Sequence, residues 1–198
     1  MVRVHPSNTD LLQISLFGNK GQLLARRILP PASIDPQEIM LTSLYFEISA
    51  ASEEAHLQIS SKDKYGRLLA LSSVPLILLA NPGEQAAALP IPKFDEIIWI
   101  QSPELNSEVE SGEILITGIV WSSSPRPLLA QLISRSGKVL AFGEIYPQAL
   151  EDQAYSNFEI TFDLILDEVQ WLQIGISEHS RELAGMLHYS SLEFQLVP

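Results

Sequence analysis

Apolar and polar residues alternate along much of this chain, which is the spacing of a β-strand that buries one face. The alternation is clearest in residues 12–16, 114–116, 172–176 and 192–196. Turn-forming residues separate these segments, and no long stretch places its apolar residues at the helical period of about 3.6. Short helical turns are expected at most in residues 35–41 and 148–153. The pattern predicts an all-β protein built from short strands, as in a β-sandwich.

Two glycines mark predicted hairpins. Gly21 and Gly137 each follow short polar residues that lie between two predicted strands. Glycine adopts the positive φ that tight hairpin turns require, because it has no Cβ. We therefore expect each glycine to lie in a hairpin turn.

The two halves of the chain repeat each other. Four blocks of the first half match four blocks of the second half in the same order, at offsets of 116, 112, 115 and 116 residues. The matched blocks begin at Leu12 and Leu128, Phe46 and Phe158, Leu57 and Leu172, and Leu76 and Leu192. Because order and spacing persist, the sequence indicates a duplication: two tandem immunoglobulin-like antiparallel β-sandwich domains.

A proline-rich stretch lies between the halves. We expect a first domain over residues 1–81, a linker over residues 82–95 and a complete second domain over residues 96–198. The first domain has no counterpart of residues 97–118, so it is predicted to be N-terminally truncated and to lack its first strand. Such a domain has an open sheet edge, and we expect the linker, the second domain or another copy of the chain to cover it. The last case is strand-edge self-association through the first domain.

The composition narrows the function classes. The chain has 198 residues, 46% of them hydrophobic, and no cysteine, which excludes a disulfide scaffold, a thiolate metal site and a cysteine nucleophile. The net charge is −12, of which −11 falls on residues 91–198. A chain this acidic is expected to bind nucleic acids poorly, because it repels their phosphate backbones. No apolar run has the length of a membrane span. Residues 1–6 have no signal-peptide core, so they are expected to be either a cytoplasmic start or a start inside a longer protein, and the repeat favours the second.

No motif indicates catalysis or a cofactor. The four histidines, His5, His56, His179 and His188, lie outside any nucleophile motif, and phosphate-binding glycine motifs are absent. Residues 61–64 fit the pattern S-x-x-K, but they are predicted to form a solvated turn. Acidic residues such as Asp163, Asp167 and Glu168 lack a calcium-loop pattern and are predicted to form a solvated face. We predict a non-enzymatic protein with no catalytic, cofactor-binding or metal-binding residue.

The three tryptophans are the candidate binding residues. Leu172, Ile174 and Ile176 are expected to face the core, so Trp171 is expected to point the other way. Around Trp121 both alternating sets of residues are apolar, and the buried face stays open. Trp171, Trp121 and Trp99 are therefore a possible platform for a ligand or a partner protein. The alternative is that they pack at the edge of the sandwich or between the two domains.

The second half resembles a known family. Residues 98–103, IWIQSP, are followed by Val109, by residues 111–114 and by Gly118 at the spacing of an opening I-x-V-x-x-P … V-x-S-P-x-x-V-x-G. Over residues 96–197 the chain resembles the Gmad2-like immunoglobulin-like domain of bacterial spore-germination and cell-envelope proteins. Gly112 stands where the family usually has proline, and residues 119–121 replace its usual aromatic–acidic pair.

The resemblance implies a function without catalysis. It implies a non-enzymatic interaction or spacer module of a larger envelope or secreted protein, hence an extracytoplasmic location. The expected partner is a protein or a cell-wall glycan. The alternative is a carbohydrate-binding module that uses exposed tryptophans.

Overall fold

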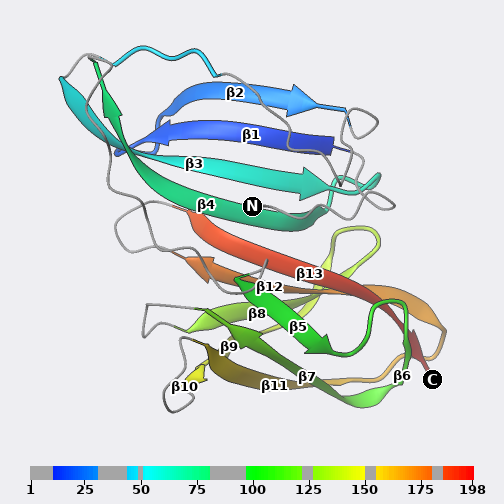
Figure 1. Ribbon diagram of the computed structural model, residues 1–198. Helices are drawn as coiled ribbons and strands as arrows, with labels where there is room; N and C mark the ends of the chain where they lie inside the picture. The colour runs from blue at the N-terminus through cyan, green and yellow to red at the C-terminus, as the bar shows by residue number, and fades with distance from the viewer. Residues whose placement is uncertain are drawn as a thin grey trace. The chain divides into compact units, whose positions relative to one another are not determined.

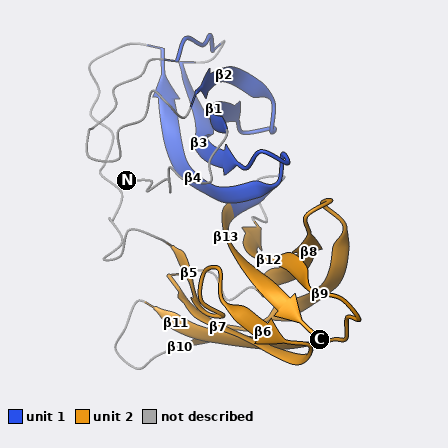
Figure 2. Cartoon of the chain, turned by 90° about the vertical axis from the view of Figure 1, so that its right-hand side faces the viewer, with its two compact units in different colours: residues 1–95, 180–187 blue, residues 96–179, 188–198 orange. Residues whose placement is uncertain are grey.

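The computed structural model describes residues 11–30, 44–48, 51–80, 97–121, 127–149, 155–179 and 185–198. The chain is all-β, as predicted, and its sheets are antiparallel except for one short parallel strand pair. It divides into two compact units, coloured separately in Figure 2: residues 1–95 with 180–187 form unit 1, and residues 96–179 with 188–198 form unit 2. The predicted linker and the start of the predicted first domain lie largely outside the described residues, so those predictions stay open.

Unit 1 contains one four-stranded sheet among its described residues (Figure 1). Its strands are β1 (Leu11–Gly18), β2 (Leu23–Leu29), β3 (Ser52–Lys62) and β4 (Leu68–Leu79), in the order β2-β1-β3-β4. Alternate residues of β1, including Leu12, Ile14 and Leu16, are buried on one face, which we call the inner face. Leu44 and Ile48 pack against this face.

Unit 2 contains two sheets. The first has the order β10-β11-β7-β5, with β5 (Ile98–Ser102), β7 (Gly112–Val120), β10 (Gln148–Ala149) and β11 (Ser156–Leu164). The second has the order β13-β12-β8-β9, with β8 (Leu128–Ser134), β9 (Val139–Ile145), β12 (Gln170–His179) and β13 (Met186–Val197). The expected helical turn in residues 148–153 is wrong where it is described, because Gln148–Ala149 is strand β10.

Both sheets contribute side chains to one core, so unit 2 is a β-sandwich. Ile114, Ile116 and Phe158 come from the first sheet, and Leu172, Ile174 and Ile176 come from the second; each is at most 3% exposed. The expected inward direction of the last three is confirmed. In β7 the alternation also settles the open question of its faces, because Ile114, Ile116, Gly118 and Val120 are buried.

A short strand connects the two sheets of unit 2. After β5, strand β6 (Glu108–Glu110) leaves the first sheet and pairs in parallel with the end of β13. Backbone bonds extend this pairing: Asn106 N donates to Glu193 O, Gln195 N to Ser107 O, and Ser111 N to Val197 O, over 2.6–2.8 Å. The chain segment 98–111 is thus hydrogen-bonded to both layers of the sandwich.

The hairpins of the two units share one turn geometry. Gly21 and Gly137 have φ of 76° and 82° and lie in the β1–β2 and β8–β9 turns, as predicted. Both hairpins shift register at equivalent positions, between Leu16 and Phe17 and between Leu132 and Ile133. Gly66, with φ of 79°, ends a third turn of this kind between β3 and β4.

The next strand pairing departs from the sequence alignment. Leu57 and Leu172 lie in central strands, as expected, but Leu16 pairs with Leu57 whereas its counterpart Leu132 pairs with Ile174. The structural equivalent of Leu57 is therefore Ile174, two residues further on. An even shift keeps the same residues on the same face, so the burial pattern tolerates it.

Gly118 gives the first stability prediction. A Cβ at this inward position would collide with the carbonyl oxygen of Trp99 and with the ring of Phe158. Backbone cannot yield as a flexible side chain does, so Gly118→Ala should lower the free energy of unfolding of unit 2 by about 2 kcal/mol. Denaturation followed by tryptophan fluorescence measures it, with Thr161→Ala on the exposed face of β11 as the control. Equal midpoints for the two variants would contradict the prediction.

Candidate functional site

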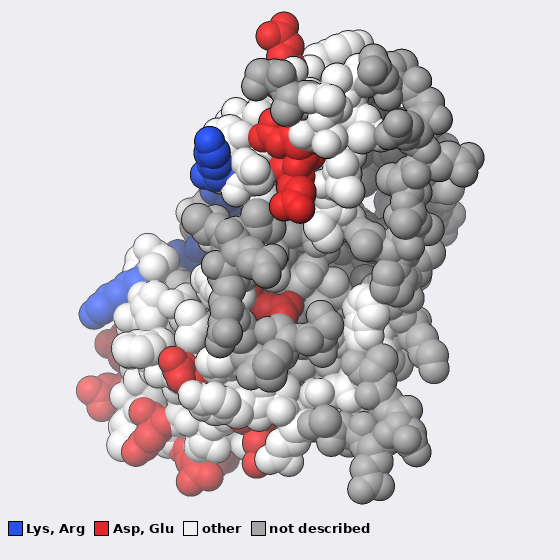
Figure 3. Space-filling view, turned by 90° about the vertical axis from the view of Figure 1, so that its left-hand side faces the viewer, with Lys and Arg blue, Asp and Glu red and all other residues white. Residues whose placement is uncertain are grey.

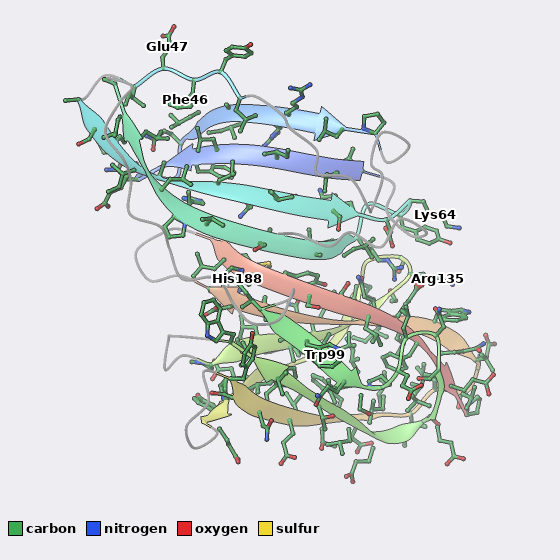
Figure 4. All side chains as sticks on the ribbon, in the orientation of Figure 1. Phe46, Glu47, Lys64, Trp99, Arg135 and His188 are labelled. Carbon is green, nitrogen blue, oxygen red and sulfur yellow. The ribbon has the colours of Figure 1, made fainter. Side chains whose placement is uncertain are left out.

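The outer face of β5 and β7 carries a row of large apolar side chains. Trp99 pairs with Ile119, and Trp121 N donates to Ile97 O over 2.8 Å, which extends the same ladder by one more pair. Alternation along β7 puts Leu115, Ile119 and Trp121 opposite to its buried residues. We call Trp99, Leu115, Ile119 and Trp121 the Trp99 face; Figure 4 shows Trp99 on β5.

The Trp99 face is accessible to solvent and bordered by polar residues. Trp99 is 45% exposed and Leu115 is 50% exposed, while Ile119 and Trp121 are partly buried. The neighbouring strand β11 pairs Asn157 with Ile119 and Thr161 with Leu115. An apolar row with a polar border is typical of a binding surface, because the apolar residues supply affinity and the border supplies hydrogen bonds.

Trp171 does not belong to this face. It lies on β12 in the other sheet, and the guanidinium of Arg135 lies over its ring at 4.9 Å from the centroid. Arg135 Nε is in turn 3.5 Å from Glu193 Oε1. The structure therefore brings Trp99 and Trp121 together and separates them from Trp171. No pattern in the sequence indicates that Arg135, two residues before the turn glycine, covers an indole ring.

A histidine and a serine do meet on β12. His179 Nε2 lies 3.1 Å from Ser177 Oγ, and Ser177 Oγ also donates to Leu129 O at 3.3 Å. A nucleophilic serine has to reach its substrate, whereas Ser177 is 6% exposed. The contacts of its hydroxyl join β12 to β8, which is a structural role.

Acidic residues gather on unit 2. Glu113 of β7 pairs directly with Asp163 of β11, and both are exposed. Acidic atoms outnumber basic ones over the lower part of Figure 3, where unit 2 is drawn. Within the described ranges no three acidic or histidine side chains are arranged to hold a metal ion. The exposed acidic side chains give this surface a negative electrostatic potential, which favours cationic partners.

The β3–β4 turn is more buried than the solvated turn predicted for residues 61–64. Asp63 and Arg67 are each 8% exposed, and Arg67 Nη2 lies 2.7 Å from Asp63 Oδ2. Asp63 Oδ1 accepts bonds from the backbone N–H of Tyr65 and of Arg67, both at 2.9 Å. Lys64 and Arg67 both lie near the ring of Tyr65. Asp63 and Arg67 are thus buried against each other, which the hydropathy of the single residues does not predict.

A small cavity of about 240 Å³ lies among the described residues of unit 1. His56 borders it, stacked on Phe17 at 5.1 Å between ring centroids. Burial lowers the pKa of His56, so the imidazole is neutral at pH 7. The volume is below the range of about 300–1,000 Å³ of usual ligand pockets, so the Trp99 face is the stronger candidate.

No protein-family model matches this chain, and no curated protein matches it significantly. The resemblance to the Gmad2-like family therefore stays a prediction. No helix in the described part of the chain is both long and apolar enough to cross a membrane.

Proposed function

We propose that this chain is a non-catalytic interaction module of a larger bacterial cell-envelope or secreted protein, and that it binds a partner protein through the Trp99 face. The observation that carries the proposal is the exposed Trp99 beside Ile119 and Trp121 on one sheet face. Tryptophan is enriched among the residues that dominate binding energy at protein interfaces.

The strand order supports an immunoglobulin-like reading of unit 2. When strands are numbered along the chain, the sheets β5-β7-β11-β10 and β13-β12-β8 have the same strand orders as the two sheets of an immunoglobulin constant domain. Strand β9 is one additional strand at the edge of the second sheet. The order β2-β1-β3-β4 of unit 1 repeats that of β9-β8-β12-β13. Domains of this class commonly present sheet faces and end loops to partners, which agrees with the resemblance to envelope proteins.

The test places a photo-crosslinking amino acid at position 99 of the full-length protein in its native cells. The expected result is one discrete protein adduct. The control carries the same group at Ile165, which is 75% exposed in the β11–β12 connection and outside the Trp99 face. Identical adducts from positions 99 and 165, or none from position 99, would contradict the proposal.

A carbohydrate ligand is the second candidate, and a specific observation favours it. On the same sheet face as Trp99, strand β11 lies on the far side of β7 and presents Asn157 and Glu159, which can hydrogen-bond to the hydroxyls of a sugar chain that spans the face. Titration of tryptophan fluorescence with peptidoglycan fragments and common polysaccharides separates the two candidates. A saturable change that Trp99→Ala abolishes would favour the glycan over the protein partner.

A further inference from the structure

In each unit, one sheet has an exposed strand at its edge. Strand β2 is the last strand of the unit 1 sheet and β9 is the last of its sheet in unit 2, so within the described residues each has a strand neighbour on one side only. The two strands are equivalent in the repeat, because each is the second strand of a hairpin with the same bulge. An edge strand leaves a row of backbone donors and acceptors that can pair with another strand.

Each of these two edge strands exposes a large apolar side chain. On β2, Ile28 is 55% exposed, and on β9, Phe142 is 78% exposed. Proteins commonly protect such edges with charges, proline or short length. Here each strand has seven residues and contains no proline. The exposed charges of the two strands differ in sign, with Arg26 and Arg27 on β2 and Glu144 on β9.

One antiparallel register matches all these features. If residues 25–29 pair with residues 141–145, Ile28 lies opposite Phe142 and Arg26 lies opposite Glu144. Residues that pair across strands lie on the same face of a sheet. The four side chains therefore lie on the faces opposite to the cores, because their partners Gln13, Ser15, Gln131 and Leu129 alternate with the core residues of β1 and β8. The same register keeps the buried residues Leu29 and Ile145 on the inner side. Aromatic–β-branched pairs and opposite charges are stabilising cross-strand pairs.

We propose that copies of this chain associate head to tail, with strand β2 of one copy pairing antiparallel to strand β9 of the next. Such a contact joins two different surfaces, so it leaves one free edge at each end and allows further growth. The interface is small, which predicts weak association with a Kd on the order of 100 µM. This inference is independent of the Trp99 face, which lies on the other sheet of unit 2.

The test uses two blocking variants, Ile28→Lys and Phe142→Lys, measured by sedimentation velocity at several times the expected Kd. The unmodified chain should form a concentration-dependent series of oligomers, and each variant alone should be monomeric. An equimolar mixture should form a 1:1 dimer that does not grow, because the intact β9 of one variant meets the intact β2 of the other.

The control is Leu115→Lys, which introduces the same charge on the Trp99 face and should leave the oligomer series unchanged. Circular dichroism checks that every variant is folded. A monomeric unmodified chain, or two variants that stay monomeric when mixed, would overturn the proposal. Dimers formed by one variant alone would also overturn it, because they require pairing between identical edges.

Discussion

Asp63→Ala is expected to lower the free energy of unfolding of unit 1 by about 3 kcal/mol. The Asp63 carboxylate accepts three hydrogen bonds within one turn, from the backbone N–H of Tyr65, from the backbone N–H of Arg67 and from Nε of Arg67. Its Oδ2 also forms an ion pair with Nη2 of Arg67 at 2.7 Å. The substitution would remove the carboxylate that lies 2.7 Å from the guanidinium of Arg67, a side chain that is 8% exposed. An uncompensated buried charge costs far more than the net strength of an exposed ion pair.

The distribution of tryptophan makes this measurable. All three tryptophans lie in unit 2, so their fluorescence reports the unfolding of unit 2, whereas circular dichroism reports both units. Asp63→Ala should lower the unfolding midpoint of unit 1, which is visible by circular dichroism but not by tryptophan fluorescence. Lys64→Ala, an exposed neighbour in the same turn, is the control and should change stability by less than about 0.5 kcal/mol. If both variants unfold alike, the buried pair has no such role.

Unit 2 is expected to lose about 3 kcal/mol of stability as the pH falls from about 6.5 to about 4 because of one histidine. Burial lowers the pKa of His188 from 6.5 to about 4. The unfolded chain therefore binds a proton at a higher pH than the folded chain, and protonation favours unfolding. This contribution to stability is complete above pH 6.5, declines as the pH falls, and levels off below pH 4.

His188→Gln removes the titrating group, so the test is the difference between the two stability curves followed by tryptophan fluorescence. Carboxylates also titrate in this range, but they are present in both proteins and cancel in the difference. His56→Gln is the matched control, because His56 is a second buried histidine with a lowered pKa but belongs to unit 1. Parallel curves for the unmodified chain and His188→Gln would refute the assignment.

Local signals in the sequence were sufficient for the strands and the hairpins. Gly21 and Gly137 located two turns because positive φ restricts the residue type, and the alternation of Leu172, Ile174 and Ile176 located a buried strand. Pairing between distant strands was harder. The two-residue shift between Leu57 and its counterpart Ile174 is invisible in the sequence, because either register buries the same alternating residues.

The candidate site was only partly predictable, because its residues meet through the sheet. The sequence drew attention to all three tryptophans, but only pairing across β5 and β7 brings Trp99 beside Ile119 and Trp121. The position of Trp171 beneath Arg135 depends on how the β8–β9 turn folds back toward β12. Likewise, Asp63 and Arg67 read as solvated charges until the turn places each against the other.

The parallel pairing of β6 with β13 has a mechanical consequence. The N-terminal end of β6 and the C-terminal end of β13 lie at opposite ends of this strand pair. Tension applied between them would pull the two strands in opposite directions along their length. The bonds that involve Asn106, Ser111 and Gln195 would then be sheared together rather than broken one after another, as they are when a hairpin is peeled open. In a module that separates or tethers other parts of a protein, this connection would keep the sandwich closed under load.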